Sequence, residues 1–131
     1  MHKIILGILL LSSTIFSLDW VKDIDTALAV AQKENKNVMV FVESPYCKWC
    51  KKMKDHTFSD ESVEKRLEKY VVVTVMKNDS KAMVNLPHVK GVPATFFMNA
   101  NKNVIESAIG YLTVEEFILY INDVEKKKGY L

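Results

Sequence analysis

Two continuous apolar segments constrain the fold of this 131-residue chain more than any other feature. One is VMVFV, residues 38–42, and the other is YVVVTVM, residues 70–76. Short apolar runs that are rich in β-branched residues are typical of strands buried on both faces, because a strand with one wet face alternates between apolar and polar residues. We therefore expect two buried strands in a sheet that is covered by helices.

Helices and further strands are expected around these two runs. Apolar spacing, capping residues and helix-forming composition predict helices at residues 23–33, from about Cys47, after Ser59, within 79–89 and after Thr113. Two more strands are expected at residues 95–98 and 104–109, joined by a hairpin turn. This order of elements predicts an α/β fold with a mixed central sheet of about four strands flanked by helices.

The only two cysteines, Cys47 and Cys50, lie in the segment ESPYCKWCKKMK. Such a pair can be a redox couple, part of a metal site or a structural disulfide. A zinc site that adds His56 and His88 is disfavoured, because these histidines lack the short paired spacing of zinc modules. A structural disulfide that closes so small a loop would stabilise little. Copper(I) binding by the thiolates is a further alternative, with Met53 as the one methionine nearby.

The N-terminus is typical of a secretory signal peptide. It has a basic residue, Lys3, then an apolar run over residues 4–11, and a small residue at Ser17 before the expected cut. An uncleaved anchor is the alternative, although the run is shorter than the roughly 20 residues of a membrane span. We expect residues 1–17 to be the signal peptide and residues 18–131 to be one domain, exported to the periplasm or an equivalent compartment. Thiols there are oxidised unless a partner keeps them reduced.

Two motifs together resemble the thioredoxin-fold family, and in particular its exported thiol–disulfide oxidoreductases. CKWC, residues 47–50, lies between a buried strand and a helix, and GVPAT, residues 91–95, precedes the third strand. The resemblance covers residues 20–125, which is nearly all of the expected mature chain. It implies a thioredoxin fold with a cis peptide bond before Pro93 that packs beside a redox-active disulfide.

The position of the cysteines explains how they could exchange disulfides. At the start of a helix, the Cys47 sulfur faces unpaired backbone N–H groups, so we expect the pKa of its thiol to be lowered. Cys47 is therefore the expected nucleophile. Cys50 lies on the same helix face and is expected to be the more buried, resolving thiol.

Four further residues are candidates for substrate binding. A cis bond before Pro93 would turn the Val92 backbone toward Cys47, where it could pair with an extended substrate. Trp49 and Tyr46 could line the same groove, or could simply cover local apolar surface.

The sequence departs from the family pattern in one respect that concerns proton transfer. Many thioredoxins have a buried acid six residues before the first cysteine, and here that residue is Phe41. Glu43 could replace it as the proton acceptor for Cys50, acting through water. The alternative is that Glu43 is a solvent-facing end of the strand.

The function expected from these features is the reduction of protein disulfides by the cysteine pair. Oxidation of substrate thiols, isomerisation of substrate disulfides, and a non-catalytic binding module with a structural disulfide are the alternatives. No glycine-rich dinucleotide motif occurs, so we expect no cofactor beyond the disulfide, and electrons would come from a membrane thiol donor. The net charge of +2 and the lack of a basic stripe argue against nucleic acid as a partner. We expect a monomer and no bound metal.

Overall fold

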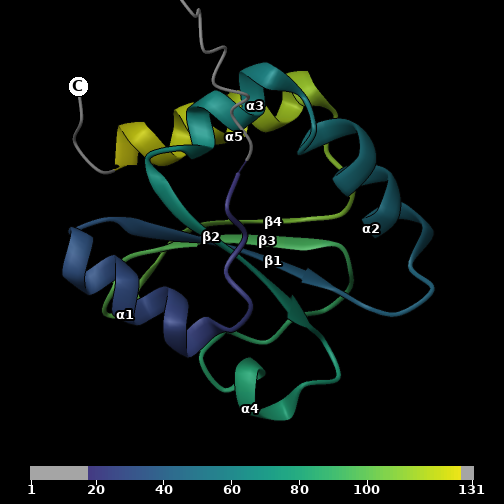
Figure 1. Cartoon of the computed structure of the whole chain (residues 1–131). Coiled ribbons are helices and arrows are strands. Elements are labelled where there is room, and N and C mark those ends of the chain that lie inside the picture. Colours follow the sequence, from purple (N-terminus) through teal and green to yellow (C-terminus); the bar gives the residue numbers. More distant parts are fainter. Residues whose placement is uncertain (1–17, 128–131) are drawn as a thin grey trace, which may run out of the picture.

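The computed structural model describes residues 18–127, so the expected signal peptide lies outside the described residues. The elements follow one another as α1 (Ile24–Glu34), β1 (Asn37–Glu43), α2 (Lys48–Lys52), η1 (Met53–Thr57), α3 (Glu61–Leu67), β2 (Tyr70–Met76), α4 (Ser80–Met83), β3 (Ala94–Met98), β4 (Val104–Ile109) and α5 (Val114–Lys127). They form a four-stranded sheet in the order β2-β1-β3-β4 (Figure 1). β1 pairs parallel with β2, and the other pairs are antiparallel. This confirms the expected mixed sheet.

The two apolar runs form the strands that they predict. Residues 38–42 in β1 are fully buried, because β1 lies between β2 and β3 and has helices on both faces. β2 is an outer strand of the sheet, yet its residues 70–73 are also buried. Residues 18–21 run along its outer edge, where the Val21 N–H donates to the Val72 carbonyl at 2.8 Å.

The sheet separates two apolar cores. In Figure 1, α1 and α4 lie on one side of the sheet, and α3 and α5 lie on the other. The α5 side is rich in aromatic rings, with Phe117 at 5.3 Å from Phe58 and 5.9 Å from Tyr120 between ring centroids. Edge-to-face pairs of this kind stabilise a core beyond the area that they bury. Cys50 is part of the core on this side of the sheet, so the cysteine segment packs against that core.

Local capping agrees with the sequence at one helix and differs at another. Thr113 and Glu116 form a reciprocal capping box at the start of α5, with hydrogen bonds of 2.9 and 3.2 Å, which confirms the expected cap. The expectation that Ser59 caps α3 is wrong. Asp60 is the cap, and its carboxylate accepts from the Ser62 and Val63 N–H groups. The Ser59 hydroxyl instead donates back to the Asp55 carbonyl in the preceding turn.

A π-helical turn that the sequence does not predict follows α2 directly. This turn, η1, covers Met53–Thr57, and its last residue is fully buried. The Thr57 hydroxyl donates to the Leu112 carbonyl at 2.6 Å, which ties the end of η1 to the loop before α5. Single π-turns of this kind occur often at functional sites. None of the helices in residues 18–127 is long and apolar enough to cross a bilayer.

Candidate active site

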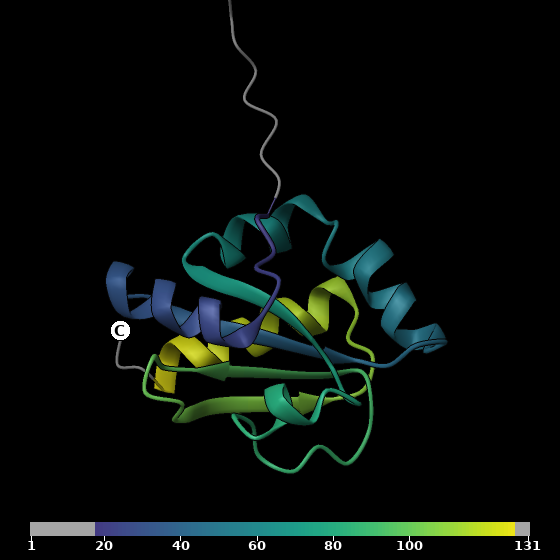
Figure 2. The same ribbon diagram turned by 60° about the horizontal axis from the view of Figure 1, so that its bottom comes forward.

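The chain runs from the end of β1 into α2 at one end of the sheet (Figure 2), and this segment contains Cys47 and Cys50. Cys47 and Cys50 are joined by a disulfide with a Cα–Cα distance of 5.2 Å. Cys47 is the N-cap of α2, and its Sγ accepts from the Cys50 N–H at 3.2 Å. Cys50 is 1% exposed, whereas Cys47 is half-buried. The expected helix start and the expected difference in burial are both present.

The turn between β1 and α2 presents a fully exposed aromatic side chain. Tyr46 has a left-handed backbone, with φ of 62°, and its ring is in solvent beside the disulfide. The Cys47 N–H donates to the Ser44 carbonyl at 3.4 Å, which closes the turn. Tyr46 does not cover local apolar surface.

The Pro93 segment lies at the same end of the sheet as the disulfide. The Val92–Pro93 peptide bond is cis, in agreement with the resemblance. Ala94 pairs with Val42, so the next register position places Pro93 opposite Glu43, just before the cysteine turn. The Pro93 carbonyl accepts from the Gly110 N–H at 2.8 Å, which joins this segment to the loop after β4.

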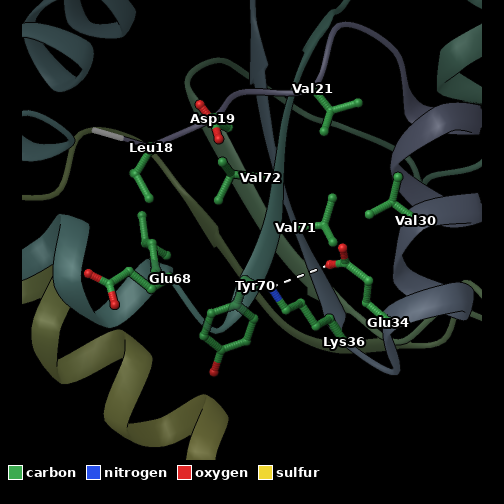
Figure 3. A pocket seen from close by; sticks show the side chains of 11 residues that line it. Leu18, Asp19, Val21, Val30, Glu34, Lys36, Glu68, Tyr70, Val71 and Val72 are labelled. Atoms are coloured by element: carbon green, nitrogen blue, oxygen red, sulfur yellow. Dashed lines mark ion pairs between the residues drawn. The ribbon is translucent and has the colours of Figure 1, made fainter. Parts of the chain in front are cut away.

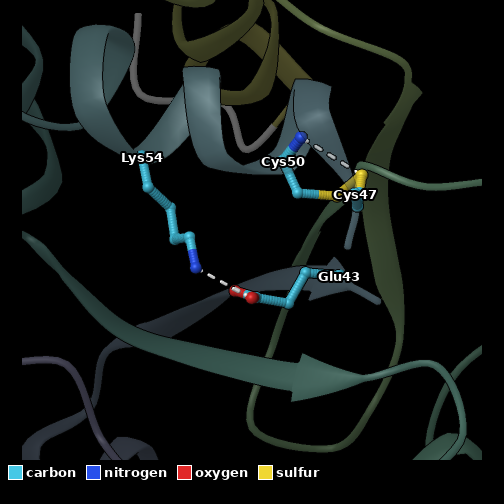
Figure 4. The surroundings of a disulfide bond; sticks show 4 residues. All are labelled: Glu43, Cys47, Cys50 and Lys54. Carbon is cyan, nitrogen blue, oxygen red and sulfur yellow. Dashed lines mark hydrogen bonds and ion pairs between the residues drawn. A yellow bond between two sulfur atoms is a disulfide. The ribbon is translucent and has the colours of Figure 1, made fainter. Parts of the chain in front are cut away.

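Glu43 is not a solvent-facing strand end. Its side chain is 12% exposed, and its carboxylate forms an ion pair with Lys54 at 2.8 Å (Figure 4). Both side chains line a pocket of about 600 Å³ whose wall also includes Cys47 and Cys50. The ion pair with Lys54 could not be predicted from the sequence, because a lysine one turn after Cys50 could equally face solvent.

A second carboxylate, Asp55, lines the same pocket but is more exposed. It pairs with Lys51, and the hydrogen bond from that lysine lowers the pKa of Asp55 below its ordinary value. Asp55 is therefore a weaker base than an ordinary carboxylate.

Phe41 is fully buried at the position where many thioredoxins have an acid. Its ring packs edge-on against Phe58 at 4.9 Å between centroids. Its cross-strand neighbour is Thr95, which is also buried. The apolar contact of Phe41 leaves no proton acceptor beneath the disulfide from this position.

An aromatic pair beside the disulfide was not predicted. The Trp49 ring is 49% exposed and lies 5.5 Å from the Tyr111 ring. The Lys52 ammonium lies 5.0 Å from both ring centroids, close enough for a cation–π contact with each. The only signal in the sequence is that Tyr111 follows the fourth strand, whose end meets the cysteine segment.

A second pocket has no residue of the cysteine segment in its wall. It has a volume of about 320 Å³ and lies between residues 18–21, α1 and β2 (Figure 3). Its polar side chains include the ion pair of Glu34 and Lys36, at 3.4 Å, and its wall has no cysteine or histidine. Within residues 18–127, no group of three or more His, Cys, Asp or Glu side chains could hold a metal ion.

Comparison with known proteins assigns the chain to a family. Residues 19–100 match the family described as Thioredoxin-like. The chain belongs to the thioredoxin-like family. The match includes CKWC and the segment that leads into β3, so the disulfide and the Pro93 loop are features of a thioredoxin-like domain.

Curated relatives of this thioredoxin-like chain are much longer proteins. It is 29% identical over 104 residues to the thiol:disulfide interchange protein DsbD of Yersinia enterocolitica, covering 75% of this chain and 18% of that protein. It is 30% identical over 97 residues to DsbD of Actinobacillus pleuropneumoniae, covering 70% of this chain and 17% of the relative. The chain thus spans less than a fifth of the length of these relatives.

Solved structures agree with the family over whole domains. A thioredoxin from Thermus thermophilus is 27% identical with a TM-score of 0.73, over 87% of this chain and 92% of that one. The oxidised C-terminal domain of Neisseria meningitidis DsbD has a TM-score of 0.61 at 22% identity, over 75% and 90% of the two chains, and this likeness shows the fold alone. The chain therefore combines the thioredoxin fold of its family with a Cys-x-x-Cys disulfide.

Proposed function

We propose that this protein is a thiol–disulfide oxidoreductase that reduces protein disulfides outside the cytoplasm, as a monomer formed by residues 18–131 after removal of a signal peptide at residues 1–17. The observation that carries the proposal is the unequal burial of the two sulfurs. Cys47 caps a helix and is partly open to solvent, while Cys50 is 1% exposed beneath it. A reductase needs one sulfur that a client can reach and one that can attack only the first.

The exchange proceeds in two steps from the reduced dithiol. The Cys47 thiolate attacks one sulfur of the client disulfide, and the other client sulfur leaves as a thiolate that takes a proton from water. The Cys50 thiol then gives up its proton and attacks the Cys47 sulfur, which releases the second client thiol. Two electrons pass to the client, and the Cys47–Cys50 disulfide is formed.

Glu43 is the residue that we propose as the proton acceptor for Cys50, through water. Two observations support it: the carboxylate is 12% exposed, and it lines the pocket that both cysteines line. Asp55 is the other carboxylate on the wall, and it is more exposed.

The client would bind as an extended segment across the disulfide. Pro93 follows a cis bond at the end of β3, so the backbone of Val92 is the part of this loop that could pair with such a segment. Trp49 and Tyr46 are exposed side chains of the cysteine segment, where they could contact client side chains.

A membrane thiol donor would return the disulfide to the dithiol form. The likeness to DsbD, which is named a thiol:disulfide interchange protein, supports a partner of this class. The disulfide itself is the redox group, so the proposed cycle needs no bound cofactor.

The reduction potential of the Cys47–Cys50 pair tests the direction of electron flow. The mature domain would be equilibrated with dithiothreitol or glutathione buffers, and the dithiol fraction measured by thiol alkylation. A value near the thioredoxin range, about −270 mV, supports a reductase. A value near about −120 mV would show an oxidant instead. A pair that does not exchange would leave the disulfide a structural one.

Trapping experiments test the proposed roles of the individual residues. Cys50→Ala should accumulate a mixed disulfide with a client at Cys47, whereas Cys47→Ala should accumulate none. In the protein with both cysteines, Glu43→Gln should slow the release of the client from its mixed disulfide with Cys47 and change the pH dependence of that rate. An unchanged rate across pH would remove Glu43 from the mechanism.

A further inference from the structure

The segments that meet around the disulfide are cationic, although the chain as a whole is nearly balanced. The chain has 18 basic and 16 acidic residues. The three segments at the site, residues 44–52, 88–93 and 109–112, contain four lysines and no aspartate or glutamate. They are joined by the contact of Trp49 with Tyr111 and by the hydrogen bond from Gly110 to Pro93.

Three of these lysines have no acidic partner within the described residues. Lys51 pairs with Asp55, which neutralises it. Lys48 and Lys90 are exposed and form no ion pair with residues 18–127, and Lys52 contacts only the two aromatic rings. Glu43, the acid closest in sequence to Cys47, is already paired with Lys54. Within residues 18–127, the positive charge of these three lysines is therefore not paired with an acidic side chain.

The unpaired lysines come from two of the segments that meet at the site. Lys48 directly follows Cys47, and Lys90 lies three residues before Pro93, a span of at most about 10 Å. The three segments also carry exposed apolar side chains, Tyr46, Trp49 and Ile109, with Ile109 next to Gly91. An extended client segment laid across the disulfide would contact the apolar side chains at its centre and the lysines toward its ends.

We propose that this surface selects client segments in which acidic side chains flank the cysteine and an apolar side chain lies beside it. The inference rests on the proposed function, since it names the class of substrate for the same site. Unpaired surface charges on one partner act mainly by steering the oppositely charged partner and by raising the rate of encounter. The selection is therefore a matter of association rate and falls as salt screens the charges.

The test uses two cyclic disulfide peptides that are identical except that the residues flanking the cysteines are aspartates in one and lysines in the other. The reduced mature domain should reduce the acidic peptide roughly tenfold faster than the basic one at low ionic strength. The ratio should shrink toward unity at about 0.5 M salt, where the screening length is a few ångströms. Hydroxyethyl disulfide, which is uncharged, reports the intrinsic reactivity of Cys47, and each peptide rate is divided by it.

A charge-reversed variant and a matched control locate the effect. Lys48→Glu combined with Lys90→Glu should abolish or invert the preference, without touching the aromatic pair. Lys33→Glu combined with Lys65→Glu makes the same change in net charge on the exposed faces of α1 and α3, and should keep the preference. Equal rates for the two peptides in the wild type, or a preference that survives in the first variant, would overturn the inference.

Binding without exchange separates this inference from the proposed function. In a variant with Cys47→Ser and Cys50→Ser, fluorescence anisotropy of labelled peptides should still show tighter binding of the acidic peptide. Preferential binding without exchange in the wild type would overturn the proposed function and keep the surface. Exchange without any preference, in rate or in binding, would overturn the surface and keep the function.

Discussion

The hydrogen bond between Thr57 and Leu112 offers a direct test of what holds η1 in place. Thr57 is fully buried, and its hydroxyl donates to the Leu112 carbonyl at 2.6 Å. Thr57→Val replaces the hydroxyl with a methyl group of nearly the same size, so it leaves no cavity. It removes the donor and leaves the carbonyl of a half-buried residue without that partner. We expect a loss of about 1–2 kcal/mol in the free energy of unfolding, or roughly 4–8 °C in Tm.

Two companion variants separate the hydroxyl from the methyl group. Thr57→Ser keeps the donor and should lose about 1 kcal/mol for the missing methyl group. Thr57→Ala loses both and should cost about 2–3 kcal/mol. Urea denaturation followed by circular dichroism measures all three, with an unchanged m-value showing that only stability has moved. If Thr57→Ala were no less stable than Thr57→Ser, the hydrogen bond would contribute nothing and the reasoning would be refuted.

Two further predictions concern pH. Burial raises the pKa of Tyr120 above its ordinary value of 10.0, so the folded state resists ionisation and stability should fall as the pH rises above about 10. Tyr120→Phe, which loses the 3.0 Å bond to the Thr95 carbonyl, should be about 1 kcal/mol less stable at neutral pH and lack that alkaline decline in thermal melts. The hydrogen bond from Ser62 lowers the pKa of Asp60, so the stability from this cap is present above about 3.8 and is lost as the pH falls through the lowered value. Acid titration followed by circular dichroism should show that Asp60→Asn lacks this contribution, and an unchanged acid transition would contradict it.

Elements that depend on local pattern could be predicted from the sequence. β2 at Tyr70–Met76 and β4 at Val104–Ile109 have the expected bounds, and α2 begins directly after Cys47 as expected. A continuous apolar run or a cap next to helix formers fixes such elements without reference to distant residues. The error at Ser59 is also local, because two good capping residues are adjacent there and only the preceding turn decides between them.

Features that join distant segments could not be predicted in the same way. Glu43 lies in β1 and Lys54 lies in η1. Trp49 and Tyr111 are in contact, although three strands lie between them in the sequence. Each residue has an ordinary solvent-exposed interpretation on its own. The register of β1 with β3, and of β3 with β4, brings Tyr111 to the end of the sheet where Trp49 lies. The turn from β1 into α2 and η1 brings Lys54 back to Glu43.

Residues 18–21 protect the outer edge of β2. An uncovered strand edge is a template on which another chain can add a strand and begin to aggregate. Here the Val21 N–H donates a hydrogen bond to the Val72 carbonyl, and Val21 forms a parallel β-bridge with Val73. Processing that removed these few residues would expose that edge. We therefore expect a form of the protein that lacks residues 18–21 to aggregate more readily than one that keeps them.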